Sequence, residues 1–577
     1  MQNKAQYIII LAELTLYYFK KGEITMKKIL RTACRFLAAT MLMSTATALV
    51  APISAQAESP DAEYEAKKAA YREKLMADDV TTDDILIGSW VSWYSFDIDS
   101  WEYQLDQMAA AGINFNMFPH HFGAGRELTE EYWSEVEEEY AKRNMVYQSP
   151  GTIDPNLVDD RVSLAAGKEH CIGYHVKDEP TGDQLQTMAD IIKLFREADS
   201  NIYPFINLFP SYAGETALGG TYYEHVSRFV ELAGAENIEY LSHDHYPFLA
   251  DGSVRTAIFG DMEAVRAVAY ENGKLKTHAF PQSTAWNGMR MPNIHEMRWN
   301  AYAYLAYGFK ALSWFNLVCP GNSDTEGEGF RDSLIYRDGT IRDPELFAAW
   351  GELNWEVRGL SSVLMNLDTV HAYHTDKRAK GVEIIPSDFF MKCAGGTRNG
   401  GFIVSVMEPK EGDDSYIMIF NKDYEKEDLS GTFTFSSDSG VKWVEYFDPF
   451  IGEYIPVELT NGKFSTDFRP GEGRLYRLRY DAPPASTEET TETPVEETTE
   501  APTESTAEAT TEAPVAESTA APVDAVTEAP ANDATTVAEE TTASGGGCSG
   551  TLSLGTLALG LTLLPAVFFR KKKELSD

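Results

Sequence analysis

Residues 171–210 read CIGYHVKDEPTGDQLQTMADIIKLFREADSNIYPFINLFP and combine a strand, a helix and a second strand. The two ends, 171–178 and 202–209, are short apolar runs of the kind found in buried strands. Between them, apolar side chains recur at the spacing of one helix face, at Met188, Ile191, Ile192 and Phe195. The stretch therefore predicts one strand–helix–strand unit of an α/β protein.

The same alternation extends in both directions, over residues 85–365. The expected strands are 85–93, 113–119, 145–149, 171–178, 202–209, 240–246, 275–280 and 311–317. The expected helices are 101–111, 130–143, 157–166, 184–198, 222–233, 258–271, 294–307 and 344–360. Eight such units match a (β/α)8 barrel in number and size. A doubly wound open sheet is the alternative, but the glycine-rich phosphate loop typical of it is missing from the sequence.

Residues 366–481 have a different pattern. Short stretches of alternating apolar and polar residues lie between turns rich in Asp, Gly and Lys, at 402–407, 416–420, 431–435, 441–447 and 475–478. This pattern predicts an antiparallel β-sandwich after the barrel.

Composition excludes several classes of protein. The 577 residues include 89 acidic and 49 basic side chains, which gives a formal charge of −40. A surface this negative repels phosphate backbones, so no nucleic-acid partner is expected. The five cysteines are far apart and form no CxxC pair, which excludes a disulfide scaffold and a zinc ribbon.

The N-terminal segment is typical of an exported protein. Met26 is followed by four basic residues within ten positions, then by a small and apolar stretch over 36–50. Ala55–Ala57 has the A-x-A form of a cleavage site, so 26–57 is predicted to be a signal peptide. Residues 1–25 are expected to come from a start codon placed too early, because Lys20–Glu23 can be encoded by a purine-rich ribosome-binding sequence.

The C-terminal segment predicts a stalk and an anchor. Residues 482–543 carry 15 acidic side chains and no Lys, Arg or aromatic residue, a composition typical of disorder. Residues 551–569 are uncharged and long enough to span a bilayer, and the basic tail after them is expected in the cytoplasm. The predicted organisation is therefore an N-terminal extension (1–25), signal peptide (26–57), helical lead-in (58–84), barrel (85–365), sandwich (366–481), stalk (482–550), transmembrane helix (551–569) and basic tail (570–577).

Active sites of (β/α)8 barrels lie at the C-terminal ends of the strands. The residues expected there are aromatic, acidic and amide side chains: Trp90, Asp178, Glu179, Asn207, Asp244, His245, Tyr246, Gln282 and Trp314. Sugars need this mixture, since aromatic faces pack on the rings, polar groups bind the hydroxyls and two carboxyl groups perform hydrolysis.

The strand-four sequence Gly173–Pro180 and the strand-six sequence Ser242–Phe248 resemble clan A glycoside hydrolases, in particular family-42-like bacterial barrels. The resemblance implies that Glu179 is the general acid/base and that Trp314 forms the floor of the sugar site. It also implies a glutamate nucleophile at the end of strand seven, where this chain has Gln282. Asp178 likewise replaces the asparagine that usually precedes the acid/base.

Because an amide cannot form a glycosyl ester, either the strand alignment is shifted, or another carboxylate serves as the nucleophile, or the barrel only binds sugars. Asp244 is the best candidate for a replacement carboxylate. The leading prediction is therefore a cell-surface glycoside hydrolase with Glu179 and Asp244 as catalytic residues. Its expected partners are an oligo- or polysaccharide substrate and, through the anchor, a membrane; no organic cofactor is implied.

Two alternatives remain open. A barrel that binds sugars without cleaving them would explain Gln282. A metal-dependent hydrolase would use His243 and His245, which share one face of a strand, together with His120 or His121.

Overall fold

The computed structural model describes residues 60–90, 98–117, 129–286, 288–318, 330–336, 340–395, 401–425 and 429–482. The predicted signal peptide, the segment before it, the anchor and the basic tail lie outside these ranges, as do His120, His121 and nearly all of the stalk. Over the ranges described, no helix is long and apolar enough to cross a membrane.

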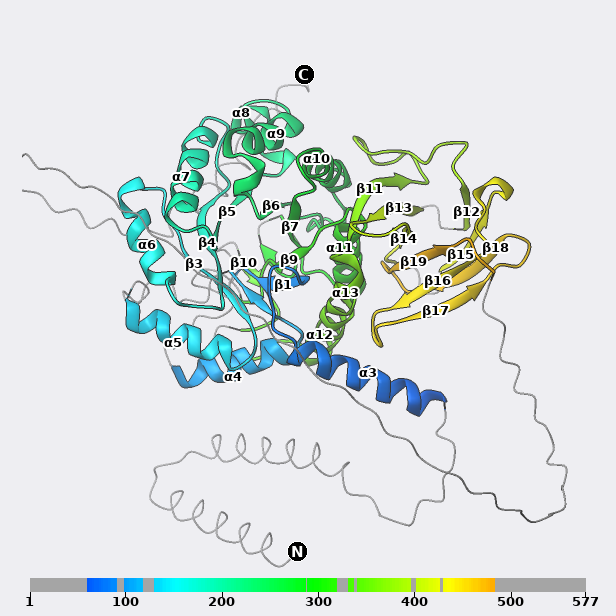
Figure 1. Ribbon diagram of the computed structural model, residues 1–577, viewed down its shortest axis with the longest axis horizontal. Coiled ribbons are helices and arrows are strands. Elements are labelled where there is room, and N and C mark those ends of the chain that lie inside the picture. The colour runs from blue at the N-terminus through cyan, green and yellow to red at the C-terminus, as the bar shows by residue number, and fades with distance from the viewer. Residues whose placement is uncertain are drawn as a thin grey trace, which may run out of the picture. The chain divides into compact units, whose positions relative to one another are not determined.

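Eight parallel strands form the barrel (Figure 1). They are β1 (Leu86–Ser89), β2 (Phe115–Asn116), β3 (Val146–Pro150), β4 (Cys171–Asp178), β5 (Tyr203–Leu208), β6 (Tyr240–Asp244), β7 (Lys276–Phe280) and β9 (Ala311–Trp314). The ring closes between the first two strands, where Asn114 donates from its backbone N–H to the oxygen of Ile87 at 3.0 Å. A Cβ atom at residue 88 would lie 2.6 Å from the ring of Phe115, so Gly88 permits this close approach. The predicted (β/α)8 barrel is confirmed.

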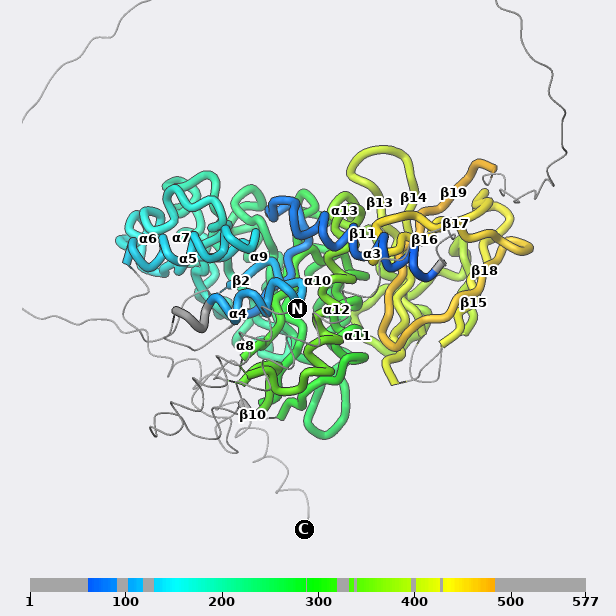
Figure 2. Tube along the Cα trace, turned by 90° about the horizontal axis from the view of Figure 1, so that it is seen from below, coloured from blue at the N-terminus to red at the C-terminus, as the bar shows by residue number. Residues whose placement is uncertain are grey.

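A helix follows each strand of the barrel. These helices are α4 (Ile98–Ala110), α5 (Glu130–Ala141), α6 (Val158–Ala165), α7 (Leu185–Ala198), α9 (Tyr222–Ala233), α10 (Ile258–Glu271), α11 (Ile294–Ala306) and α12 (Pro344–Gly359). Figures 1 and 2 show α5, α6, α7 and α9 one after another around the strands. Shorter helices are α8 (Glu215–Leu218) and α13 (Ser361–Leu364), and α3 (Pro60–Ala77) precedes the barrel.

Local sequence signals set where the helices begin. Asn293 and Glu296 form a capping box at the start of α11, in which each side chain accepts a bond from the other residue's backbone. At α12, Asp343 caps the first turn and Pro344 occupies the first helical position. These caps set the starts of α11 at Ile294 and of α12 at Pro344.

The predicted antiparallel sandwich is confirmed, with more strands than expected. Its strands are β11 (Leu367–His374), β12 (Met391–Gly395), β13 (Phe402–Pro409), β14 (Ser415–Asn421), β15 (Leu429–Phe435), β16 (Trp443–Asp448), β17 (Glu453–Glu458), β18 (Lys463–Phe468) and β19 (Gly473–Arg479). One sheet has the order β11-β13-β14-β19-β16-β17 and the other has the order β12-β15-β18. The sequence did not predict β17, which is an edge strand of mostly exposed residues.

Buried polar contacts join the sandwich to the barrel. Trp299 on α11 donates from Nε1 to the backbone oxygen of Lys422 at 3.0 Å. Tyr302 on the same helix donates to Glu356 Oε1 at 2.7 Å, and this carboxylate also pairs with Arg469 of the sandwich. The contacts tie α11 and α12 to the sandwich.

Candidate active site

Three carboxyl groups meet at the C-terminal end of the barrel. Asp178 is the last residue of β4, Glu179 follows it, and Asp244 is the last residue of β6. Asn207 on β5, the strand between them, donates from Nδ2 to Asp178 Oδ1 at 3.1 Å and to Asp244 Oδ1 at 3.3 Å. One amide nitrogen therefore holds two carboxyl groups as close neighbours.

The backbone at Glu179 is strained. Its φ of 46° lies in the left-handed region, which non-glycine residues rarely adopt. The Glu179 N–H donates to the backbone oxygen of Asn207 at 2.8 Å, which fixes the bend where β4 ends. A backbone of this kind costs about 1–3 kcal/mol and is concentrated at functional sites.

Burial raises the pKa of all three carboxyl groups. For Glu179 it acts together with the negative charges of Asp244 and Asp178, which raise the pKa well above its usual range, while Lys177 opposes the shift. The pKa of Asp244 is raised by burial and by Asp178, whereas hydrogen bonds from Asn207 and Tyr246 partly offset the shift. A group that keeps its proton near neutral pH suits the work of a general acid.

The pKa of Asp178 is raised as well, mainly by burial, and the Asn207 hydrogen bond and Lys177 oppose the shift. Like charges this close disfavour simultaneous ionisation, so the cluster holds at least one proton over a wide pH range. Such a cluster provides an acid and a carboxylate side by side.

Aromatic side chains surround the carboxyl groups. The ring of Tyr246 lies 4.9 Å from the ring of Trp286 and 4.9 Å from that of Phe315. Tyr212, in the loop after β5, is 41% exposed, and Asp244 and Glu179 contribute to the raised pKa of its hydroxyl after burial itself. Tyr212 thus provides exposed aromatic surface of the kind on which sugars pack, whereas Tyr246 and Trp286 are each only 7% exposed.

Arg255 adds a positive charge to this side of the barrel. Its guanidinium carbon lies 4.5 Å from the centre of the Tyr212 ring, and Nη1 donates to the backbone oxygen of Tyr246 at 3.3 Å. Tyr212, Arg255 and Trp286 were not predicted from the sequence, and Phe315 lay within the predicted strand 311–317 without being named as a site residue. Tyr212 follows β5, and Trp286 lies in the short strand β8 (Ala285–Trp286) after β7, so both are aromatic residues beyond the end of a barrel strand.

The structure places three predicted sugar-binding side chains elsewhere. Trp314 is buried, and its Nε1 donates to Asn354 Oδ1 on α12 at 2.9 Å. His245 is also buried, with Nδ1 2.6 Å from Asp261 Oδ2 on α10. Both side chains lie on the helix side of their strands, because neighbouring residues of a strand point to opposite faces.

Gln282, the third of these, is a structural residue. Its side chain has no exposed surface, and Oε1 accepts a bond from the Phe248 N–H at 3.1 Å. Nε2 donates to the backbone oxygens of Phe248, Thr284 and Arg290. The prediction that Gln282 binds substrate was therefore wrong, since its polar atoms are occupied by backbone groups.

Trp90 occupies the interior of the barrel. Its ring lies 5.2 Å from that of His175 and 5.3 Å from that of Phe280, both in edge-to-face contact. Only 7% of Trp90 is exposed, so most of the ring packs against the core of the barrel. Contact of Trp90 with a sugar stays a prediction.

The histidines of β6 do not converge as a metal site would require. His243 Nδ1 lies 3.1 Å from the Tyr222 hydroxyl on α9, and His245 faces Asp261 on α10. Among the residues that the structure describes, no group of three His, Cys, Asp or Glu side chains is arranged to hold an ion.

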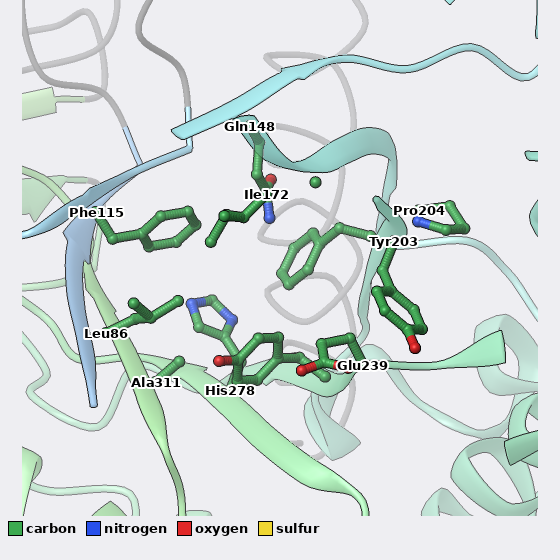
Figure 3. Close-up of a pocket in the computed structure, with 12 residues that line it drawn as sticks. Leu86, Phe115, Gln148, Ile172, Tyr203, Pro204, Glu239, His278 and Ala311 are labelled. Atoms are coloured by element: carbon green, nitrogen blue, oxygen red, sulfur yellow. The ribbon is translucent and has the colours of Figure 1, made fainter. Parts of the chain in front are cut away.

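A small cavity lies at the opposite end of the barrel (Figure 3). It is lined by residues at the N-terminal ends of strands, including Leu86 and Tyr203, and by the His278 ring. Its volume of about 20 Å³ is that of a water site. The cavity is therefore too small for a sugar ring, and the carboxyl cluster is the candidate active site.

Among known proteins, the chain is similar to solved structures of glycoside hydrolases. No protein-family model matches the chain, and no curated protein matches it either. The structure is similar to a β-galactosidase from Bacillus circulans sp. alkalophilus, with 9% identity, a TM-score of 0.46 and coverage of 69% of this chain and 99% of that one. A GH42 β-galactosidase from G. stearothermophilus has 9% identity and a TM-score of 0.45 over 70% and 100% of the two chains.

A family 5 glycoside hydrolase from Bacteroides vulgatus has 11% identity and a TM-score of 0.42, over 68% of this chain and 88% of that one. The (β/α)8 fold itself rests on the strand order of this chain.

Proposed function

We propose that this chain is a cell-surface glycoside hydrolase that cleaves O-glycosidic bonds with the carboxyl groups of β4 and β6. The observation that carries the proposal is the Asn207 amide, which holds Asp178 and Asp244 next to the strained Glu179 at the C-terminal end of the barrel. The substrate is an oligo- or polysaccharide, as the aromatic side chains around the carboxyl groups suggest.

Glu179 is the general acid/base. Its raised pKa keeps the carboxyl protonated near neutral pH, so it can donate that proton to the glycosidic oxygen as the bond to the anomeric carbon breaks. The resulting carboxylate then accepts a proton from the attacking water. Both transfers return Glu179 to its starting state.

Asp244 is the second carboxylate. Burial and Asp178 raise its pKa, and hydrogen bonds from Asn207 and Tyr246 oppose that shift. In its ionised form the Asp244 carboxylate can attack the anomeric carbon or activate a water. Direct attack would form a glycosyl ester and retain the configuration, whereas attack by water would invert it. Asp178 adds negative charge beside both groups.

A second candidate is a barrel that binds sugars without cleaving them. The observation that favours it is the end of β7, where residues 276–286 contain no acidic side chain and Gln282 is occupied by backbone groups. Export through residues 26–57 and anchoring through residues 551–569 belong to both proposals and rest on the sequence.

The test compares the full chain with Glu179→Gln. Each protein is incubated with aryl glycosides and with plant and host polysaccharides, and the release of aryl alcohol and reducing sugar is measured. Wild type is expected to hydrolyse at least one substrate, and the variant to lose about 10²–10⁴-fold in kcat. Glu215→Gln changes an exposed glutamate on α8 and is the control that should stay fully active.

Sugar binding is measured alongside by calorimetry. Binding without hydrolysis in wild type, unchanged in Glu179→Gln, would contradict the hydrolase and support the sugar-binding barrel.

A further inference from the structure

A chain of hydrogen bonds crosses the interior of the barrel behind the carboxyl groups. Asn207 Oδ1 accepts from Ser242 Oγ at 2.9 Å, Ser242 Oγ lies 2.8 Å from His278 Nδ1, and His278 Nε2 lies 2.8 Å from Ser313 Oγ. The four residues come from β5, β6, β7 and β9 and are at most 2% exposed. The chain therefore links residues of four neighbouring strands through the buried interior of the barrel.

The bonding pattern sets the direction of the first two bonds in this chain. The Asn207 oxygen only accepts, so the Ser242 hydroxyl must donate its single proton to it. Ser242 Oγ then accepts from His278, which places a histidine proton on Nδ1. The Ser313 hydroxyl can donate to or accept from His278 Nε2, and in a neutral ring with Nδ1–H it donates.

The surroundings of His278 agree with a neutral ring. Burial lowers its pKa to about 3, and His243 adds to the effect. The rings of Phe205 and Phe280 meet it edge to face at 5.1 Å and 4.7 Å, which fixes the plane of the imidazole. Both nitrogens are thus held toward their serine partners.

We infer that His278 and Ser242 are positioning residues, which orient the Asn207 amide so that its NH2 group faces Asp178 and Asp244. That NH2 group has two protons for two carboxyl groups, whereas a rotated amide would turn its oxygen toward them. The charged and titratable groups near the pair are Lys177, Glu179, Tyr246 and Tyr212. The catalytic role of Asp244, one of these two carboxyl groups, rests on the proposed function.

The test replaces His278 in the full chain by Phe and by Asn. Phenylalanine keeps a planar ring between Phe205 and Phe280 but cannot bond Ser242, whereas asparagine carries an amide N–H near the position of Nδ1. For His278→Phe we expect kcat to fall about 10- to 100-fold, with KM changed less than about 2-fold, as for other residues that act through a ligand of the reacting group. His278→Asn is expected to recover most of that loss.

The pH profile separates positioning from mere packing. The Asn207 hydrogen bonds lower the pKa of Asp178 and Asp244, so their loss should raise both pKa values. In His278→Phe and in Ser242→Ala, the fall of kcat on the acid side of the pH profile should therefore move to higher pH. Ser242→Ala is the second variant, for use where His278→Phe does not fold. Thr277→Val, a buried change on the opposite face of β7, is the control and should leave this fall at the same pH.

A measurement without substrate completes the test. Nitrogen NMR of the histidine-labelled full chain identifies the His278 ring as the signal that disappears in His278→Phe. That ring should be protonated at Nδ1 and unprotonated at Nε2, with no titration above about pH 4, as expected for a buried imidazole. Protonation of the His278 ring at Nε2, or its titration near pH 6.5, would overturn the inference whether or not the chain cleaves sugars. If the chain cleaves sugars, an unshifted fall of kcat on the acid side in both variants would overturn it too.

Discussion

The Asp244 side chain is buried among other acidic groups, and this burial lowers the stability of the folded state. Its side chain is buried beside Asp178, and both burial and that charge raise its pKa. The unfolded chain releases this proton near the ordinary aspartate pKa of about 4, whereas the folded chain holds it to higher pH. The folded state therefore loses stability as the pH rises through that window.

Asp244→Asn is expected to stabilise the protein while it destroys activity. Asparagine has no charge to bury, so at neutral pH the free energy of unfolding should rise by on the order of 1–3 kcal/mol. At pH below about 4 the difference should vanish, because the aspartate is then protonated in both states. Thermal unfolding measured against pH checks this. Asp251→Asn is the control: Ser253 lowers the pKa of that exposed aspartate, so its loss should give no stabilisation.

Gln282→Glu tests whether a nucleophile is simply missing from β7. A glutamate there would point a buried carboxylate at the backbone oxygens of Thr284 and Arg290, to which Nε2 now donates. We expect a loss of about 3–5 kcal/mol in unfolding free energy and no gain in kcat, as for other uncompensated buried charges. A stable variant with higher kcat would show that Gln282 occupies a working nucleophile position.

At the residue scale, the strand ends predicted the carboxyl groups but not every neighbour. Asp178, Glu179 and Asp244 meet because parallel strands end at the same edge. His245 and Trp314 each come one position after a residue that faces the interior of the barrel. Because side chains alternate along a strand, theirs face the surrounding helices instead. Which of two adjacent residues faces inward depends on the pairing of all eight strands, which no local pattern contains.

At the element scale, β9 and α12 are held together by Trp314. Its indole donates to Asn354, whose own amide donates to the backbone oxygen of Ala111 at 2.9 Å. The indole ring also lies 6.1 Å from that of Trp350 on α12. The bond thus links the last strand of the barrel, the last helix and the end of α4.

Trp314→Phe should therefore affect stability and leave sugar affinity unchanged. Phenylalanine keeps the ring packing but leaves the buried Asn354 oxygen without its donor, at a cost of about 1–3 kcal/mol. Denaturant unfolding measures the loss, and KM or calorimetric binding measures the affinity. A tenfold weaker affinity with unchanged stability would restore Trp314 as the floor of the sugar site.

The sequence predicted the elements of the barrel better than those of the sandwich. The predicted runs 171–178, 202–209 and 240–246 lie within two residues of β4, β5 and β6, because strands buried on both faces are continuous apolar stretches. In the sandwich, four of the six residues of β17 and three of the six residues of β18 are exposed, and the pairing of these strands with β16 and β15 defines them. Pairing between distant strands is a tertiary property, so local patterns missed them.

At the scale of the whole molecule, a buried ionic cluster joins the barrel to the sandwich. Arg469 pairs with Glu356 of α12 and, at 3.1 Å, with Glu472, and both carboxylates are at most 3% exposed at the side chain. Tyr302 donates to the same Glu356 oxygen. The two domains are therefore expected to unfold as one unit.

Arg469→Met should break this coupling. It removes the cation from the buried Glu356 carboxylate, which keeps the Tyr302 hydroxyl, whereas Glu472 keeps Arg474 at 3.3 Å. Because the Arg469 side chain is 41% exposed, we expect a cost of about 1–3 kcal/mol. Calorimetry of wild type should show one transition for barrel and sandwich, and the variant should show a lower first transition or two separate ones. Arg378→Met changes an exposed arginine of the sandwich and should leave the profile unchanged. Unaltered unfolding in Arg469→Met would contradict the coupling.

The separate roles of Glu179 as general acid and of Asp244 as second carboxylate are tested most directly by substrates that differ in their leaving group. The kcat/KM values of wild type, Glu179→Gln and Asp244→Asn are compared on a dinitrophenyl glycoside, whose leaving group needs no proton, and on the matching alkyl glycoside. We expect Glu179→Gln to keep most of its activity on the first and to lose about 10²–10⁴-fold on the second, while Asp244→Asn loses both. Equal losses of Glu179→Gln on the two substrates would contradict its role as the general acid.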